Sequence, residues 1–489
     1  MRRYLPLATL SIAIFAVYLY NLNGTGVISA DEPRYAAIGR SMARTGDWIT
    51  PRLWGSPWFE KPPLLYWMTA VGTELGLGPE LSGRLPVALL SLCFLIAAFF
   101  LLRREFGSEA ALVSAVLLGT SAGWLAYSQL CVTDLPLAVF FSLAVLIALP
   151  LLRADDAPSN TAPRFAAMGS CLGIAALAKG LVPIALAVPF VWFLRRYWRH
   201  WWIGAAACMI VAGPWYGAVY AANGAPFIEE FFLKHHFERL YSASLQHVEP
   251  WYYYLPVFLA GLFPWTPLVG LLWGKPTHWD QRRRFLAVIA LFGLLLFSVS
   301  LNKLPGYILP LLPSIFAQIG AEFETKPLVQ LRRIWFICCA CLIALVPLLA
   351  TILPQTLRLG RLSWSVVSLA FGSITRTEFF YIALPLAIVL IARRSWRPVL
   401  LVLSLAAGAI YLKEKSFPVL DQAVSARGLW RKVQPISADM CQDGISRDWL
   451  YGLQFYRGSV IPPCDSSRQF RYILRPNGHE PPTVQSGRQ

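Results

Sequence analysis

Two carboxylates and an arginine stand where an apolar segment of the chain ends. Asp31, Glu32 and Arg34 lie in "ISADEPRYA", directly after an apolar run from about Leu5 to Leu22. A helix cap explains part of this pattern, because an acidic residue followed by Pro and helix-forming residues is a good helix start. A carboxylate held at a lipid interface can also act as a general base, or orient a sugar hydroxyl or amine. The stretch therefore predicts a helix start and a candidate site for acid–base chemistry.

A second pair of opposite charges lies in "WFEKPPLLYW". Glu60 and Lys61 precede two prolines, which stiffen the turn that follows. One interpretation is an exposed ion pair at a turn. The other is that Lys61 meets a phosphate as a point charge, while Glu60 is a metal ligand or a second carboxylate. These residues alone leave both interpretations open.

The elements that must position these groups are membrane helices. Of the 489 residues, 56% are hydrophobic and only 14% are charged, which is more apolar than a soluble protein of this length. Apolar runs of helix-spanning length recur along most of the chain, and we count about thirteen. The sequence therefore predicts an all-α polytopic membrane protein. The candidate spans begin near Leu5, Leu85, Ala110, Val132, Phe165, Leu181, Trp201, Leu255, Phe285, Tyr307, Ile334, Phe379 and Pro398.

Two of these runs are short and almost continuous. They begin at Phe165 and Leu181. One interpretation is two separate spans, and the other is a single broken hairpin. The exact number of spans is therefore not fixed by the sequence.

Basic residues occupy every second loop between the apolar runs. This alternation predicts a cytoplasmic N-terminus and, with an odd number of spans, a C-terminus on the outer side. The net charge of +17 is thereby assigned to topology and to anionic membrane lipid rather than to nucleic acid. The basic loops hold Arg103 and Arg104; Arg153 and Arg164; Arg195, Arg196 and Arg199; Lys275 and Arg282 to Arg284; Lys326, Arg332 and Arg333; and Arg393, Arg394 and Arg397.

The remaining charges gather on or near the predicted outer face. Because ionisable groups in lipid are costly, a cluster at one depth indicates a single site at the outer interface. Two long outer loops, 23–84 and 222–254, would cover it. The charged residues in question are Asp31, Glu32, Arg34, Glu60, Lys61, Asp134, Lys179, His235, His236, His247 and Lys303.

The chain divides by composition into two parts. Residues 1–412 form the predicted transmembrane domain, and residues 413–489 form a small, more polar α/β domain on the outer side. The tail mixes a helix-like stretch, 421–433, with the strand-like "QFRYIL". Cys441 and Cys464 lie in it, where the compartment permits a disulfide, but the sequence does not decide whether they pair.

Seven motifs in order carry a resemblance to a known family. They are "DEPRYA", "GDWITPRLWGSPWFEKPPLLYW", "SGRLP", "CVTDLPL", "ALAKGLVP", "FFLKHHFERL" with "WYYYLP", and "FSVSLNKLPGYILPLLP". With them, the chain resembles the C-type (GT-C) membrane glycosyltransferases, specifically the aminoarabinose (lipid A) transferase and protein mannosyltransferase-like group. The resemblance covers about residues 1–320, and the last third matches only in general layout.

The resemblance implies a multi-pass enzyme of the bacterial inner membrane that uses a polyprenyl-phosphate-linked sugar at the periplasmic face. Asp31 matches the family's acidic residue in the first outer loop, and Asp134 matches the second acidic position. The alternative for Asp134 is a helix cap, and for Lys179 a helix-end lysine that reaches the headgroups. The positions that match donor phosphate-binding segments are Arg34, Lys61, Lys303 and Tyr307.

A zinc site is the one cofactor that the resemblance suggests. His236 aligns with the histidine of a family Glu-His pair, although His235 precedes it here, and His247 aligns with a second histidine. With Glu60 they would give one carboxylate and two imidazoles, which can hold Zn²⁺ with an open position. The alternative is that these histidines are ordinary polar surface residues of a loop.

The implied reaction is a displacement at the anomeric carbon of the sugar. The polyprenyl phosphate leaves, basic residues stabilise its charge, and Asp31 deprotonates or orients the acceptor. The resemblance favours lipid A or another membrane glycolipid as acceptor. A protein or glycan acceptor is the first alternative. A lipid or sugar transporter is the second, although transporters place ionisable groups near the midplane and contain repeats, and neither feature is found here. A structural scaffold would not explain so many charges at one face.

Overall fold

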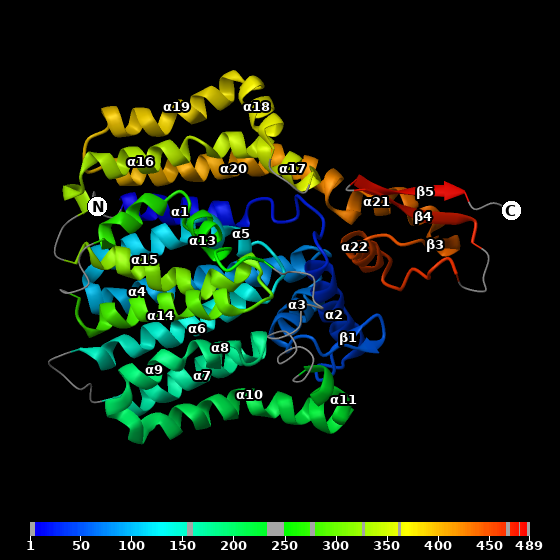
Figure 1. The fold of residues 1–489 in the computed structure, drawn as a ribbon, viewed down its shortest axis with the longest axis horizontal. Helices are drawn as coiled ribbons and strands as arrows, with labels where there is room; N and C mark the ends of the chain where they lie inside the picture. Colours follow the sequence, from blue (N-terminus) through cyan, green and yellow to red (C-terminus); the bar gives the residue numbers. More distant parts are fainter. Residues whose placement is uncertain are drawn as a thin grey trace.

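The computed structural model describes residues 5–153, 160–231, 249–273, 279–324, 328–359, 363–465, 470–478 and 480–486. It is a bundle of roughly aligned helices, with a smaller C-terminal unit attached at one end (Figure 1). The long helices of the bundle are α1 (Leu5–Leu19), α4 (Leu81–Thr120), α6 (Asp134–Ala148), α7 (Thr161–Lys179), α10 (Trp201–Asn223), α14 (Gln281–Val299), α15 (Leu312–Ala321), α16 (Arg333–Ile343), α17 (Val346–Leu359), α19 (Arg376–Ile391) and α20 (Arg397–Ala423).

Further helices connect them. Two lie at the end that carries the C-terminal unit, α2 (Asp31–Thr45) and α3 (Leu64–Glu74), beside the small hairpin of β1 (Arg52–Leu53) and β2 (Ser56–Pro57). The others are α5 (Ala122–Tyr127), α8 (Val182–Leu186), α9 (Val188–Phe193), α11 (Ala225–Ile228), α13 (Tyr254–Leu262) and α18 (Trp364–Gly372), with the 3₁₀ helices η1 (Leu149–Leu152), η2 (Arg195–His200), η4 (Thr266–Leu272) and η6 (Pro305–Leu311).

The helix α4 is a hairpin that reverses at Gly107. This residue has φ 83° and ψ 172°, a conformation that glycine adopts without the penalty of a Cβ. Leu95 and Gly119, equally distant from Gly107 along the chain, lie in contact, and Trp124 Nε1 donates to Ser91 Oγ at 2.8 Å. The two runs predicted from Leu85 and Ala110 are the arms of this hairpin.

The short runs from Phe165 and Leu181 form a broken hairpin, which was one of the open interpretations. The first arm is α7, and the second is divided into α8, α9 and η2. Phe165, near the start of α7, packs against Tyr197 of η2 at 6.2 Å between ring centres, so the two arms are antiparallel.

Among the described residues, four helices are long and apolar enough to cross a membrane, or up to seven if each bent pair is one span. That count treats the α4 hairpin as a single helix. The thirteen spans therefore stay a prediction.

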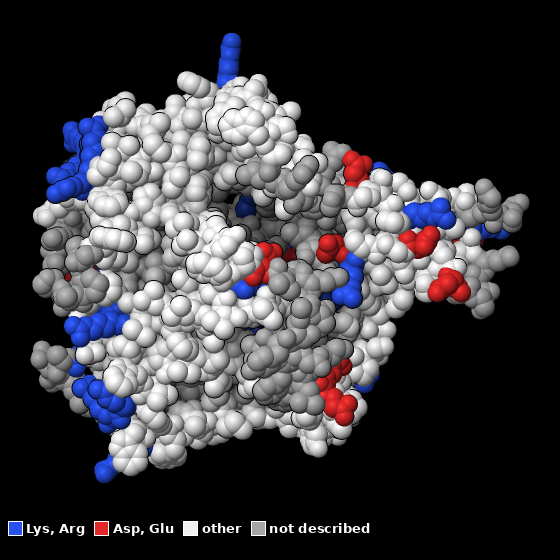
Figure 2. All heavy atoms as spheres, in the orientation of Figure 1, with Lys and Arg blue, Asp and Glu red and all other residues white. Residues whose placement is uncertain are grey.

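The described residues of the basic loops lie at one end of the bundle. Lys and Arg side chains gather at the left end in Figure 2, whereas most visible Asp and Glu lie toward the middle and the opposite end. Glu105 connects two of these loops, because its carboxylate pairs with Arg153 at 2.7 Å and with Arg282 at 3.5 Å. The alternation of charge in the sequence thus corresponds to a real division of the molecule into two ends.

The C-terminal unit begins after α20, which continues past the expected boundary at Lys413 to Ala423. Lys413 Nζ donates to the carbonyls of Val17 and Tyr20 at 2.6 and 2.8 Å, which ties α20 to the first helix. The helix-like stretch 421–433 is divided between the end of α20 and α21 (Ala426–Val433), and "QFRYIL" leads into β4 (Tyr472–Asn477).

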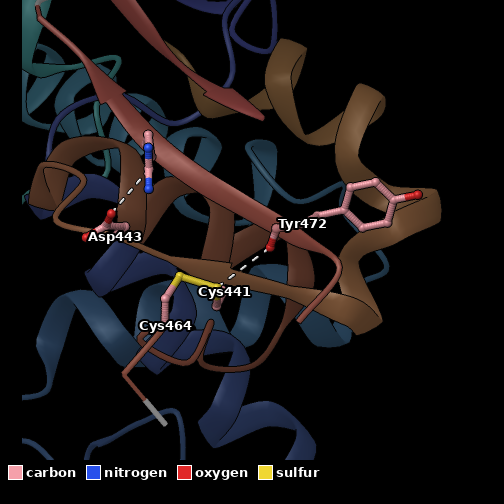
Figure 3. The surroundings of a disulfide bond; sticks show 5 residues. Cys441, Asp443, Cys464 and Tyr472 are labelled. Atoms are coloured by element: carbon pink, nitrogen blue, oxygen red, sulfur yellow. Dashed lines mark hydrogen bonds and ion pairs between the residues drawn. A yellow bond between two sulfur atoms is a disulfide. The ribbon is translucent and has the colours of Figure 1, made fainter. Parts of the chain in front are cut away.

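This unit has its own small core around Val433, Met440, Leu453 and Leu474. The strand β4 pairs in parallel with β3 (Met440–Gln442) and antiparallel with β5 (Glu480–Ser486), and α22 (Arg447–Arg457) packs with α21 beside them. Cys441 on β3 forms a disulfide with Cys464, which answers the question that the sequence left open (Figure 3).

Candidate functional site

The first turn of α2 places Asp31 and Arg34 side by side. Asp31 opens the helix as expected, but the N-cap position is that of Ala30, and the Asp31 side chain pairs with Arg34 one turn on. The negative charge still suits this place, because the N-terminal end of a helix carries partial positive charge. Arg34 is further fixed by its Nε, which donates to the carbonyl of Ala30 at 3.0 Å.

Arg34 also reaches the turn that precedes α3. Its Nη1 lies 2.8 Å from Glu60 Oε2, and Lys61 Nζ lies 2.9 Å from Glu60 Oε1. The four residues Asp31, Arg34, Glu60 and Lys61 therefore form one chain of alternating charges, which we call the Asp31 cluster. Glu60 and Lys61 are buried, so the interpretation as an exposed ion pair is wrong.

Aromatic rings surround the guanidinium of Arg34. Its Cζ lies 5.6 Å from the ring centre of Trp58 and 5.5 Å from that of Tyr451, which belongs to α22 of the C-terminal unit. The ring faces favour a cation at this distance. The C-terminal unit thus contributes directly to the Asp31 cluster, which the sequence did not indicate.

A second cluster forms where α6, α7 and η6 meet. Asp134 begins α6, and its Oδ1 lies 2.6 Å from Lys179 Nζ at the end of α7. Lys179 in turn lies 4.3 Å from the ring centre of Tyr307. We call these three residues the Asp134 cluster. Lys179 is buried and paired, which does not fit a side chain that reaches out to lipid headgroups.

Gly306 makes room for this cluster. A Cβ at this position would lie 2.7 Å from Asp134 Cγ and 2.7 Å from Tyr127 Cε1, closer than real Cβ contacts come. The glycine in "NKLPGYILP" therefore lets the backbone approach the carboxylate.

The phenol of Tyr127 lies beside Gly306, as the Asp134 carboxylate does. Burial raises the pKa of Tyr127 well above its ordinary value, and the negative charges of Asp134 and Asp31 raise it further. Charges must lie close to a group to act on it through a protein interior. Both carboxylates therefore belong to one region at the end of the bundle that carries α2.

Lys303 lies just before η6 and is 3% exposed. Its Nζ donates to the carbonyls of Ser300 at 2.6 Å and Glu249 at 2.9 Å. Within the described ranges it has no carboxylate at ion-pair distance. The next residue, Leu304, accepts a hydrogen bond from Tyr254 at 3.2 Å, which fixes the segment that leads to Tyr307.

The two clusters are each neutral, whereas Lys303 has no acidic partner among the described residues. The Asp31 cluster has two acids and two bases, and Asp134 and Lys179 cancel each other. Among the residues that the structure describes, only carbonyl groups hold the ammonium of Lys303. A buried charge without a counter-ion is costly, so an anion that binds beside Lys303 would be stabilised.

Of the three predicted zinc ligands, the structure describes only Glu60. His236 and His247 lie outside the described residues. Glu60 already has Arg34 on one oxygen and Lys61 on the other, and two cations at that distance oppose a metal ion. No group of three His, Cys, Asp or Glu residues that could hold a metal occurs in the part of the chain that the structure describes.

The sequence reasoning missed the buried ion pair between Glu32 and Arg84. Arg84 Nε and Nη2 lie 2.7 Å from the two carboxylate oxygens of Glu32, and both side chains are 2% exposed. Arg84 also donates to the carbonyls of Leu22, Thr25 and Gly26. The pair therefore fixes the loop that leads into Asp31. The one available signal was the arginine of "SGRLP" at the start of an apolar run, because such a residue needs a partner.

Comparisons with known proteins agree with this architecture. Residues 60–217 match the dolichyl-phosphate-mannose-protein mannosyltransferase family. The crystal structure of ArnT from Cupriavidus metallidurans bound to undecaprenyl phosphate superimposes with a TM-score of 0.76 at 24% identity, covering 96% of this chain and 92% of that one. The apo structure of the same protein gives a TM-score of 0.74 at 22% identity.

This chain has the fold of ArnT. The prediction of a mostly helical, multi-pass fold of the C-type membrane glycosyltransferases is thus confirmed.

The similarity to known transferases is also found in the amino-acid sequence. The chain is 32% identical over 335 residues to the undecaprenyl phosphate-alpha-4-amino-4-deoxy-L-arabinose arabinosyl transferase of Pseudomonas aeruginosa LESB58, which covers 65% of this chain and 60% of the relative. A Pseudomonas fluorescens Pf-5 transferase of the same name, numbered 2, is 30% identical over 333 residues, with 65% and 55% covered. The chain therefore spans 60% or less of the length of these two relatives, and its similarity to the aminoarabinose transferases, expected from the motifs, is confirmed.

Proposed function

We propose that this protein is a glycosyltransferase that moves a sugar from an undecaprenyl-phosphate donor to an acceptor at the periplasmic face of the inner membrane. The observation that carries the proposal is that the Asp31 cluster, the Asp134 cluster and the buried Lys303 occur together in a chain with the fold of ArnT, with the Asp31 cluster at the end of the bundle opposite the basic loops. The position of the basic loops supports a cytoplasmic N-terminus and a periplasmic C-terminus.

The donor phosphate fits best beside Lys303. A polyprenyl-phosphate sugar is a diester with one negative charge, and the departing phosphate monoester gains a second as the bond from the anomeric carbon to oxygen breaks. Lys303 is the cation of the site that no carboxylate neutralises in the described residues, so it contributes most to this developing charge. Arg34 and Lys61 contribute less, because Asp31 and Glu60 already offset them.

Asp31 fits best on the acceptor side. Its side chain is 39% exposed, against 14% for Asp134 and 6% for Glu60, so it can meet a group that arrives from outside. With a hydroxyl acceptor, the new bond forms from the acceptor oxygen to the anomeric carbon, and the hydroxyl proton passes to Asp31. With a phosphate acceptor, as on lipid A, no base is needed and Asp31 positions groups. Asp134, held by Lys179 beside Tyr307, is assigned to the sugar.

Lipid A or another membrane glycolipid is the proposed acceptor, and aminoarabinose the proposed sugar. The names of the curated relatives support the sugar, and the lipid A acceptor is consistent with them. A zinc ion on Glu60, His236 and His247 stays a separate prediction, which metal analysis of the purified protein tests. None of the steps above requires it.

The test is mass spectrometry of lipids from a host that lacks the gene but makes the lipid-linked sugar. We expect the wild-type gene to add a pentose to lipid A and to lower the donor pool. If lipid A is unchanged while the donor pool falls, the acceptor is a protein or glycan. If neither pool responds, the transferase proposal is wrong and a transport function gains support.

A further inference from the structure

A cavity opens at the basic end of the bundle, opposite the proposed active site. It has a volume of about 920 Å³ and lies between η1, η2 and α14. Four arginines line it, and none of the described lining residues is acidic. They are Arg153, Arg195, Arg196 and Arg284.

Three of these arginines have no carboxylate partner among the described residues, so their positive charge is not offset. Arg153 pairs with Glu105 and is therefore offset. Arg195 donates to the carbonyl of Trp192 at 3.0 Å, and Arg196 donates to the carbonyl of Leu151 and to the hydroxyl of Tyr197. These partners orient the guanidinium groups without neutralising them. Arg284, in the first turn of α14, is exposed.

The wall of the cavity that α14 forms beyond Arg284 is apolar. Val288 and Leu291 follow Arg284 at helical spacing along α14, and their side chains are 38% and 61% exposed. Leu295 continues the same face at 66% exposure, beyond the cavity. A molecule with an anionic head and long apolar chains would satisfy both parts at once.

Two tryptophans, Trp192 and Trp279, also line the cavity. Such residues are typical of the headgroup level of a membrane. The indole nitrogen of Trp279 is buried and has no hydrogen-bond partner among the described residues. A headgroup oxygen would provide one.

We propose that this cavity binds an anionic glycerophospholipid of the cytoplasmic leaflet. Its phosphodiester lies among Arg195, Arg196 and Arg284, and its acyl chains run along Val288 and Leu291. The site is separate from that of the donor, so the proposal rests on the proposed orientation in the membrane but not on the proposed sugar transfer. Charge complementarity selects an anionic lipid over a zwitterionic one.

Native mass spectrometry of the full chain in neutral detergent, titrated with phosphatidylglycerol or phosphatidylcholine, tests the proposal. We expect one phosphatidylglycerol to remain bound and phosphatidylcholine not to compete. The double variant Arg195→Gln/Arg284→Gln should bind about 30-fold more weakly, because each basic residue near an anionic lipid contributes about a factor of five.

The matched control is Arg393→Gln/Arg394→Gln, which removes two exposed arginines of the same end that do not line the cavity. It should bind as wild type, and an equal loss in both variants would overturn the proposal in favour of general attraction to the basic end. Weaker binding of undecaprenyl phosphate by Arg195→Gln/Arg284→Gln than by wild type would overturn it in favour of the donor, because the proposed donor site contains neither arginine. Leu291→Trp, which fills the apolar wall and keeps every arginine, should also release the lipid; retention would contradict the proposed path of the chains.

Discussion

Replacing Arg84 with methionine should leave Glu32 as a buried carboxylate without a counter-ion. In the intact protein both Glu32 oxygens lie 2.7 Å from the guanidinium. After the change, the described partners that remain are the backbone N–H groups of Ile28 and Cys131, at 2.9 and 3.1 Å. Two neutral donors do not replace a bidentate cation in a site that is 2% exposed.

The size of the loss follows from this geometry. Breaking a buried ion pair by removing one partner costs about 3–5 kcal/mol. The carbonyls of Leu22, Thr25 and Gly26 also lose their donor, which places the loss toward the upper part of that range. A loss of about 4 kcal/mol lowers the ratio of folded to unfolded protein about a thousandfold.

Equilibrium unfolding in mixed micelles measures this effect. The double variant Arg84→Met/Glu32→Leu should be more stable than Arg84→Met alone, because it removes the uncompensated charge. Arg44→Met, which alters an exposed arginine of α2, should change stability by less than about 0.5 kcal/mol. Wild-type stability in Arg84→Met, or a double variant less stable than the single one, would refute the reasoning.

Three further predictions concern the donor, the Asp134 cluster and the C-terminal unit. Lys303→Gln should weaken the binding of undecaprenyl phosphate at least about tenfold, and Lys303→Arg should restore most of it, since the charge is what the phosphate needs; equal affinity of Gln and wild type in a lipid-binding titration would contradict this. Gly306→Ala should push Asp134 aside and lower turnover at least about tenfold while donor binding persists, because the new Cβ would clash at 2.7 Å; unchanged turnover counts against the assigned role. Cys441→Ser/Cys464→Ser should destabilise the C-terminal unit by about 3 kcal/mol, so limited proteolysis there should accelerate, and identical cleavage rates with and without the disulfide would speak against it.

Features that depend on local pattern could be predicted from the sequence. Apolar runs of sufficient length predicted a mostly helical fold, and basic residues in alternate loops identified one end of the bundle. The start of α2 at Asp31 followed from an acidic residue and Pro before helix-forming residues. Each of these signals lies within a short window of the chain.

Features that depend on contacts between distant parts of the chain could not be predicted from the sequence. The partner of Glu32 is Arg84, and one of the rings over Arg34 is that of Tyr451 from near the end of the chain, so no local pattern connects them. The boundary at 413 lies inside α20, because that helix remains helical as its composition becomes polar. The resemblance named Asp31, Arg34 and Lys61 as site residues, but only the structure shows that their charges cancel within one cluster.

The most direct test of the central claim is single-turnover transfer by purified Asp31→Asn, with donor binding measured on the same sample. We expect the variant to bind undecaprenyl-phosphate sugar about as wild type does, because Lys303 holds the phosphate. We also expect transfer to fall at least about a hundredfold, the scale of a lost general base or positioning group. Transfer at the wild-type rate would contradict the claim that the chemistry takes place at the start of α2.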